Sequence, residues 1–414
     1  MNSFESVVRP WHIPMTGRDP EEPYRTSTPL ELLFDLCFVV AVSQAAGALH
    51  HDLVDGKIGH GLLNYAFVFF AIWWPWMNFT WFASAYDTDD VAYRLLTFVQ
   101  IAGVLVVTAG VPSAFEQLDF RIMVVGYVIM RIALVGQWLR AAREDPAGRT
   151  VALRFAIGVG LVQLGWVARL AVGPPWGIVG ILVLGVLDLA IPIWAERAGR
   201  PTPWHPEHIG ERYGLFTIIV LGECVLAVSA AVQLAMAAGG VSVSLLAVAL
   251  GGLLLVFALW WSYFKHPAEI DRDLSLRQAV TWGYSHYFVF AAIAALGAGL
   301  QVAVDATHEK LPLSPWAVAL TVAIPVIVYL VVTALLHQRS GAWRLLAPLS
   351  VVGVVLLAAA AGASRFGVPA AILFMALALV VFVWYSVVAM KRAFVVSTGP
   401  AESGPPHEHR EVAK

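Results

Sequence analysis

The sequence predicts an all-α integral membrane protein with about twelve transmembrane helices arranged as two six-helix repeats. Its 414 residues are 59% hydrophobic and only 13% charged, which is far from the composition of a globular domain. Apolar runs of about 18 residues or more recur along almost the whole chain, long enough to cross a bilayer. Lysine and arginine are concentrated in alternate connections between these runs.

Each expected helix is an apolar run bounded by charged residues or by glycine and proline. At about 1.5 Å per residue, such a run crosses a hydrocarbon core about 30 Å thick. Gly173, Pro174 and Pro175 divide the region 151–197 into two helices. The expected spans are 29–50, 60–84, 92–113, 120–141, 151–172, 176–197, 212–236, 242–264, 277–303, 314–337, 343–363 and 368–391.

Positive charge tests this set of helices, because cytoplasmic connections hold lysine and arginine whereas translocated connections lack them. With both ends cytoplasmic, twelve spans place twenty of the 26 basic residues on the cytoplasmic side and five on the other. The remaining one, Arg131, falls within a span. A missed or additional helix would scramble this asymmetry, so we expect cytoplasmic N- and C-termini.

Faint internal copies at a nearly constant offset indicate a duplication. Six helices per copy leave both halves facing the same way, as in parallel-repeat transporters. The expected organisation is a cytoplasmic segment 1–28, a first repeat 29–197, a linker 198–209, a second repeat 210–392 and a disordered cytoplasmic tail 393–414. Chance similarity between apolar helices is the alternative. The paired landmarks are 41–45 with 227–231, Trp73-Trp74 with Trp260-Trp261, Asp87 and Asp89 with Asp271 and Asp273, and Arg94 with Arg277.

Two carboxylate motifs carry a family resemblance. The stretch ELLFDLCFV at 31–39 resembles the ELFFDLVFV signature of the bacterial low temperature requirement protein A family, departing at Leu33 and Cys37. ERYGLFTIIVLGE at 211–223, including Glu211 and Arg212, resembles its second hallmark, and the acidic loop DTDD at 87–90 is also similar. The resemblance covers about residues 25–392. It implies a multi-pass protein of the bacterial inner membrane linked to growth in the cold, without implying a substrate.

Four ionisable residues are expected at similar depths inside the membrane. Arg131, Asp188 and His286 each lie nine residues from an arginine at the cytoplasmic edge, or about 13 Å, and Glu223 lies about 18 Å deep. Each charged group costs about 2.5–3.5 kcal/mol at the bilayer centre, so these residues should face one another or water. One arginine and two carboxylates leave one negative charge, which a proton or a monovalent cation would balance. The alternative is a static network that only fixes helix packing.

Glu31 and Asp35 form an acidic pair at spacing i, i+4, on one face of the first helix. In one interpretation Glu31 favours the helix N-terminus and Asp35 is satisfied by a neighbouring arginine or backbone group. In the other, Asp35 receives cations or protons and passes them inward towards Glu223. The repeat makes the helices of Cys37 and Cys224 equivalent, so the two acidic motifs would meet near the pseudo-axis.

The remaining polar and aromatic clusters have simpler interpretations. Asp87, Asp89 and Asp90 are expected to be solvated helix caps, with a metal role as the alternative. The spacing of His50, His51, Asp52, Asp55 and His60 fits no standard zinc motif, so no metal site is expected. An interfacial belt is the expected role of Trp73, Trp74, Trp76, Trp81, Trp260 and Trp261, and a ring around a ligand is the alternative.

The sequence therefore favours a proton- or cation-coupled secondary transporter or ion-conducting protein. The alternative is a non-transporting membrane stress or cold-growth factor whose buried polar layer is structural. We find no Walker loop, H-E-x-x-H, C-x-x-C or nucleophile elbow, so we expect neither an enzyme nor a bound cofactor. The expected partners are the lipid bilayer, protons or monovalent cations and a small-molecule substrate, with no nucleic acid.

Overall fold

A computed structural model of the chain describes residues 11–23, 25–173, 175–237, 242–265, 274–336 and 346–397. These residues form helices and no strand, which confirms the predicted all-α fold. The helices are α1 (Pro29–Val54), α2 (Ile58–Tyr86), α3 (Val91–Ala109), α4 (Val111–Gln117), α5 (Arg121–Glu144), α6 (Arg149–Arg169), α7 (Trp176–Glu196), α8 (Pro206–Ala237), α9 (Val243–Phe264), α10 (Leu276–Asp305), α11 (Pro315–Leu336), α12 (Leu346–Phe366) and α13 (Val368–Ser397).

Eleven candidate membrane spans are found among these helices, with α3 and α4 together forming one of them. Helix α2 is not in that set, although it has 29 residues and matches the expected span 60–84. It carries four tryptophans and two asparagines, which lower its hydropathy, and most of its central residues are buried. A helix surrounded by protein can be less apolar than a helix surrounded by lipid, which explains the difference. Helix α2, the expected span that is missing from the set of eleven, is therefore an interior helix.

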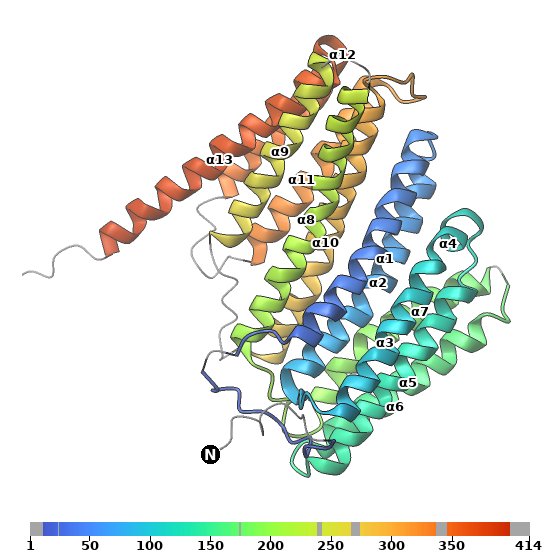
Figure 1. Cartoon of the computed structure of the whole chain (residues 1–414). Helices are drawn as coiled ribbons and strands as arrows, with labels where there is room; N and C mark the ends of the chain where they lie inside the picture. Colours follow the sequence, from blue (N-terminus) through green and yellow to red (C-terminus); the bar gives the residue numbers. More distant parts are fainter. Residues whose placement is uncertain are drawn as a thin grey trace, which may run out of the picture.

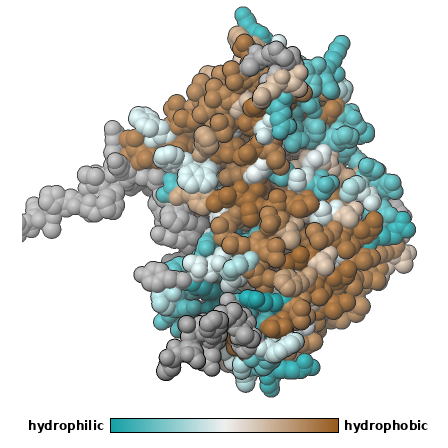
Figure 2. Space-filling view, viewed as in Figure 1, coloured by the Kyte–Doolittle hydropathy of each residue, from teal (hydrophilic) through white to brown (hydrophobic). Residues whose placement is uncertain are grey.

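Figure 1 shows the helices as two adjoining groups, α1–α7 and α8–α13, that run roughly along one direction. Helix α10 is central, because it packs on α8, α9 and α11 of its own group and on α1, α2 and α7 of the other. At the periphery, only 17% of the apolar window of α7 is buried, against 72% for α10. The visible surface in Figure 2 is largely hydrophobic along the helices, with hydrophilic residues gathered towards their two ends. This distribution suits a bilayer.

The two groups share part of their order of neighbours, although the extensive contact of α9 with α13 has no comparable contact between α2 and α7. In the first, α1 packs on α2 and α3, followed by the pairs α3–α5, α5–α6 and α6–α7. In the second, α8 packs on α9 and α10, followed by the pairs α10–α11, α11–α12 and α12–α13. A duplicated unit would give this order, and the duplication itself stays a prediction.

Several boundaries and side-chain positions differ from the expected ones. Helix α8 begins at Pro206, inside the expected linker 198–209, because proline is well suited to a first helical turn. Helix α13 continues to Ser397, past the expected boundary at 392.

Trp73, Trp74 and Trp76 are at most 1% exposed, so the expectation that they form an interfacial belt is wrong. Trp260 and Trp261 are about half exposed, as a belt requires. Asp271, Asp273 and the tail beyond 397 lie outside the described residues.

Helices α3 and α5 approach each other through two glycines. A Cβ atom at Gly126 would lie 2.6 Å from the backbone nitrogen of Val107 and 2.7 Å from the carbonyl oxygen of Gly103. Small residues at such positions let two helix backbones come into contact, which stabilises helix pairs in membranes. On the same helix, a Cβ at Gly136 would meet nothing closer than a Leu96 methyl at 3.8 Å.

We expect Gly126→Val to lower the free energy of unfolding by about 1–3 kcal/mol, because the added atoms force α3 and α5 apart. The matched control Gly136→Val, also within α5, should change it by much less. Thermal unfolding of both variants in detergent measures the difference. Equal midpoints for the two variants would contradict the close contact described here.

Candidate functional site

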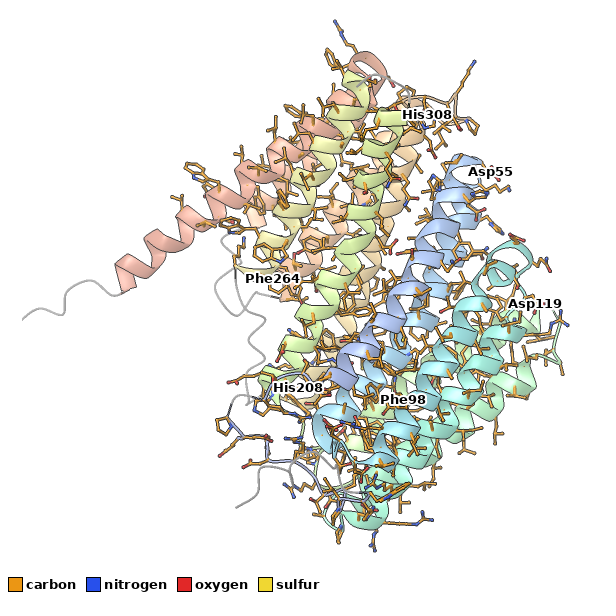
Figure 3. All side chains as sticks on the ribbon, in the orientation of Figure 1. Asp55, Phe98, Asp119, His208, Phe264 and His308 are labelled. Carbon is orange, nitrogen blue, oxygen red and sulfur yellow. The ribbon has the colours of Figure 1, made fainter. Side chains whose placement is uncertain are left out.

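The N-terminal ends of α1 and α8 face each other across the boundary between the two helix groups (Figure 3, where His208 is labelled). Helix α1 starts with a capping box, in which Thr28 bonds the backbone of Glu31 and the Glu31 side chain bonds the backbone of Thr28. Pro29 occupies the first turn. This local start orients the first carboxylate of the α1 motif towards α8.

Four ionisable side chains meet at this boundary, and we call them the α1–α8 cluster: Glu31 and Asp35 from α1, and His208 and Arg212 from α8. Each helix contributes two residues four positions apart, which places them on one helical face. All four side chains are 0% exposed. The structure thus brings the two expected carboxylate motifs together.

Arg212 is the centre of the cluster. Its Nη2 lies 2.5 Å from Oδ1 of Asp35, and its Nε donates to Oδ2 of the same carboxylate at 3.2 Å. Its Nη1 lies 2.9 Å from Oε1 of Glu31, which is ion-pair distance, although the direction is too poor for a hydrogen bond. Trp76 of α2 donates to Oδ1 of Asp35 at 2.7 Å. Asp35 is therefore satisfied by an arginine from the other helix group, as one of the two interpretations expected.

Glu31 takes its other partners from two directions. Its Oε2 accepts from the backbone nitrogen of Thr28 at 2.7 Å, and Nε2 of His208 lies 3.1 Å from Oε1. Nδ1 of His208 has no hydrogen-bond partner among the described residues. With the imidazole neutral, two carboxylates and one guanidinium leave the cluster with one negative charge, and the nearby Arg25 and Asp87 add one charge of each sign. Uptake of one proton would make it neutral.

Sequence reasoning missed His208, although a signal was present. His208 precedes Arg212 by four residues, the same spacing that singled out Glu31 and Asp35. Glu211, which was expected to belong to the motif, lies at its edge, where Oε1 accepts from the backbone nitrogen of Ser27 at 3.3 Å.

Arg131 and Asp188 form a second buried pair, between α5 and α7. Nη2 of Arg131 lies 3.5 Å from Oδ1 of Asp188, and the two side chains are 3% and 5% exposed. Trp166 donates to Oδ2 of Asp188 at 2.8 Å. Nη1 and Nη2 of Arg131 complete no hydrogen bond within the described part of the chain. The ion pair is long and incompletely bonded, so its guanidinium is less firmly held than that of Arg212.

Glu223 and His286 are buried as expected, but their described contacts join neither of them to the Arg131–Asp188 pair. Glu223 faces Ser43 of α1 and packs against Gly297 of α10. His286 lies between Tyr263, whose hydroxyl is 3.1 Å from Nε2, and the carbonyl of Trp282, 2.9 Å from Nδ1. All four residues of the expected layer therefore face protein, at three separate places.

The acidic loop after α2 is bonded rather than solvated, which corrects one expectation. Asp90 caps α3 by accepting from the backbone nitrogen of Tyr93 at 2.8 Å, and it is fully buried beneath Arg140 of α5. Asp89 pairs with Arg94 at 2.7 Å. Asp87 accepts from the backbone nitrogen of Asp89 at 2.8 Å and is 5% exposed.

The described residues before α1, 11–23 and 25–28, lie across this end of the bundle. The backbone nitrogen of Met15 donates to Glu144 of α5 at 2.6 Å, and Arg25 donates to the last carbonyls of α2, including that of Ala83 at 2.8 Å. The carbonyl of Glu22 lies 2.8 Å from Nε2 of His205, in the linker before α8. This segment thus connects both helix groups beside the α1–α8 cluster.

No metal-binding group of three or more histidine, cysteine, aspartate or glutamate residues occurs among the residues described by the structure. The polar residues near the α1–α2 connection divide into separate pairs instead. His50 lies 2.7 Å from Asp305 of α10, and His60 lies 2.8 Å from Asp52.

Asp87 and Asp90 respond oppositely to their surroundings. Burial raises the pKa of Asp87 to about 6, and the nearby charge of Glu31 adds to the effect. Burial acts in the same direction on Asp90, but hydrogen bonds from Arg140 and from backbone N–H groups outweigh it and bring that pKa to about 2. Ionised Asp87 is therefore unfavourable in the fold, whereas ionised Asp90 is favourable.

Since the pKa of Asp87 is higher in the folded than in the unfolded state, the folded state binds the extra proton between about pH 4 and 6. Stability should fall as pH rises through this window, by about 2–3 kcal/mol for this residue. We expect Asp87→Asn to gain stability relative to the wild type as pH rises from 4 to 7. Thermal midpoints of both proteins across that range measure the effect, and parallel curves would contradict it.

Comparison with known proteins agrees with the two motifs. The family model "Bacterial low temperature requirement A protein (LtrA)" matches residues 26–386, which include both halves of the α1–α8 cluster. An uncharacterized protein of Rhizobium meliloti (strain 1021) is 28% identical over 233 residues. That alignment covers 54% of this chain and 56% of the relative, so it spans about half the length of the curated relative. Because the family model covers most of the sequence, the chain belongs to the bacterial low temperature requirement A family.

Proposed function

We propose that this multi-span membrane protein is a proton- or monovalent-cation-coupled secondary transporter, or an ion-conducting protein, of the bacterial inner membrane. The observation that carries the proposal is the charge of the α1–α8 cluster. It contains two carboxylates and one guanidinium, all 0% exposed, with a histidine as the fourth member. An unbalanced charge out of water is costly, which favours uptake of one positive charge.

The position of the cluster supports a coupling role. Helices α1 and α8 are the first helices of the two expected repeats, and they pack directly on each other. Carriers built from repeats bind their coupling ions at the interface between the repeats, where relative movement of the halves changes access. A positive charge gained or lost here would change the attraction between α1 and α8. The cluster would thereby couple the binding of a proton or cation to the relative movement of the two helix groups.

The same interface continues to Glu223. Ser43, which faces Glu223, follows Asp35 by eight residues on α1, and Glu223 follows Arg212 by eleven on α8. These separations place Glu223 about 12–16 Å deeper than the cluster. We infer that Asp35 and Glu223 are successive sites for a proton or cation along the α1–α8 interface, with Arg131 and Asp188 as a separate ion pair beside it.

A role without transport, as a membrane stress or cold-growth factor, has one observation in its favour. Asp35 accepts two hydrogen bonds from Arg212 and one from Trp76, so its carboxylate is well satisfied as it stands. A static network of this kind would join the two helix groups and carry no ion. It predicts a protein that is stable but conducts and exchanges nothing.

Flux measurements separate the two functions. We expect proteoliposomes with an entrapped pH indicator to show a pH change when a sodium or potassium gradient is imposed. Glu223→Gln should abolish this change, because the amide cannot take up a proton or hold a cation. The control Glu207→Gln alters an exposed carboxylate on the same helix and should leave the flux unchanged.

Two outcomes would contradict coupling through Glu223. One is a wild-type protein that gives no pH change and no ion uptake under either gradient. The other is a Glu223→Gln variant that retains full flux. Thermal unfolding of each variant before reconstitution distinguishes loss of coupling from loss of the fold.

A further inference from the structure

A cleft of about 170 Å³ lies between the two helix groups, at the ends of α2 and α7 and the beginning of α10, with the linker before α8 forming one side. It is separate from the α1–α8 cluster. Five aromatic side chains and one carboxylate are among the described residues that line it. The residues that matter here are Trp81, Trp138, Phe155, Trp204, Tyr284 and Glu196.

Contacts among the lining rings and with Tyr213 hold the aromatic walls of the cleft in place. Trp81 and Trp204 pack edge to face with their ring centroids 5.0 Å apart, and Nε1 of Trp81 donates to the Tyr213 hydroxyl at 3.0 Å. Trp138 and Phe155 are stacked 4.2 Å apart. These rings come from α2, α5 and α6 of the first helix group and from the linker, whereas Tyr284 comes from α10 of the second. The walls are preformed, which reduces the ordering cost of binding.

Tyr284 connects the cleft to the membrane interior. Its hydroxyl donates to the carbonyl of Leu189 at 2.8 Å, next to Asp188 of the buried Arg131–Asp188 pair. Glu196 lies eight residues after Asp188, two turns along α7. The cleft therefore lies directly beside the buried pair at the boundary between the helix groups.

Glu196 supplies the charge of the cleft. Both of its oxygens accept hydrogen bonds from Thr202, one from the hydroxyl at 2.6 Å and one from the backbone nitrogen at 3.0 Å. A carboxylate has about four acceptor positions, so others stay open towards a ligand. The described residues that line the cleft include no lysine or arginine. Glu196 is thus the one charged side chain among the described lining residues, which disfavours an anionic ligand.

These features select one class of ligand. A bare inorganic cation prefers a shell of oxygen ligands, whereas these walls are mostly apolar, with aromatic rings beside aliphatic side chains. A neutral apolar molecule would leave Glu196 without a cation. Aromatic faces beside a carboxylate recognise quaternary ammonium groups through cation–π attraction. The volume is close to that of a cavity of about 150 Å³ that holds one benzene molecule in another protein, so it admits one small ligand.

We propose that this cleft binds a small organic monocation with a quaternary ammonium group, held by Glu196 and bordered by Trp81 and Trp204. Binding of such a ligand in the cleft does not depend on transport. Use of the cleft as the substrate site of a carrier rests on the proposed function, and quaternary ammonium compounds would then be the substrate class.

Binding of choline to the purified full-length protein tests the proposal. Choline and its uncharged carbon isostere, 3,3-dimethyl-1-butanol, are titrated by calorimetry at constant ionic strength without any ion gradient. We expect choline to bind at least about tenfold more tightly than the isostere, because only the cation gains cation–π and carboxylate attraction. Glu196→Gln should remove that preference, whereas Glu207→Gln, at an exposed carboxylate outside the cleft, should retain it.

A second pair of variants covers the case in which Glu196→Gln fails to fold. Trp204→Leu should weaken choline binding by about threefold to tenfold, and Trp204→Phe should retain most of it, since phenylalanine keeps an aromatic face. Equal affinities for choline and the isostere would overturn the proposal. So would full choline preference in Glu196→Gln, or equal binding by the two Trp204 variants.

The results distinguish this proposal from transport itself. Choline binding that needs Glu196, in a protein without any flux, would support the cleft and contradict the carrier. Glu223-dependent flux without choline binding would support the carrier and contradict the cleft.

Discussion

Ionic side chains cannot be left unpaired away from water, and the rest of the structure depends on how this constraint is met at Arg212. Its guanidinium has no exposure and lies within ion-pair distance of Asp35 and Glu31. Because the partners lie on α1 and the arginine on α8, their pairing fixes how the two helix groups meet. The capping box at Thr28 and the contact between Glu22 and His205 are arranged around the same boundary.

The same constraint explains the other buried charges. Helix α7 is largely exposed on its outer surface, yet Asp188 is turned inward towards Arg131 and Trp166. The two ion pairs differ in how firmly they are bonded. Arg212 donates two hydrogen bonds to Asp35, whereas Arg131 completes none with Asp188. A tightly bonded pair favours one arrangement of helices, and a loosely bonded pair tolerates several.

Much of the fold could be predicted because hydropathy and positive charge act along the chain, one helix at a time. The candidate site depends on which face of each helix a side chain occupies. Counting residues from the membrane edge gives the depth of a side chain but not its face. Arg131, Asp188, Glu223 and His286 were placed at similar depths, yet only the first two are in contact. Likewise, Trp73 and Trp74 look interfacial in sequence but face the interior. His208 was predictable from its spacing to Arg212. That these two residues pair with Glu31 and Asp35 could be learned only from the packing of α1 on α8.

A double-mutant cycle between Asp35 and Arg212 tests most directly whether their pairing joins the two helix groups. The free energy of unfolding is measured for Asp35→Asn, Arg212→Gln and the double variant. Arg212→Gln should cost the most, about 3–5 kcal/mol, because it leaves two buried carboxylates without their cation. The double variant should be more stable than the sum of the single losses predicts, by at least about 1.5 kcal/mol. Single losses that simply add within about 0.5 kcal/mol would contradict the account.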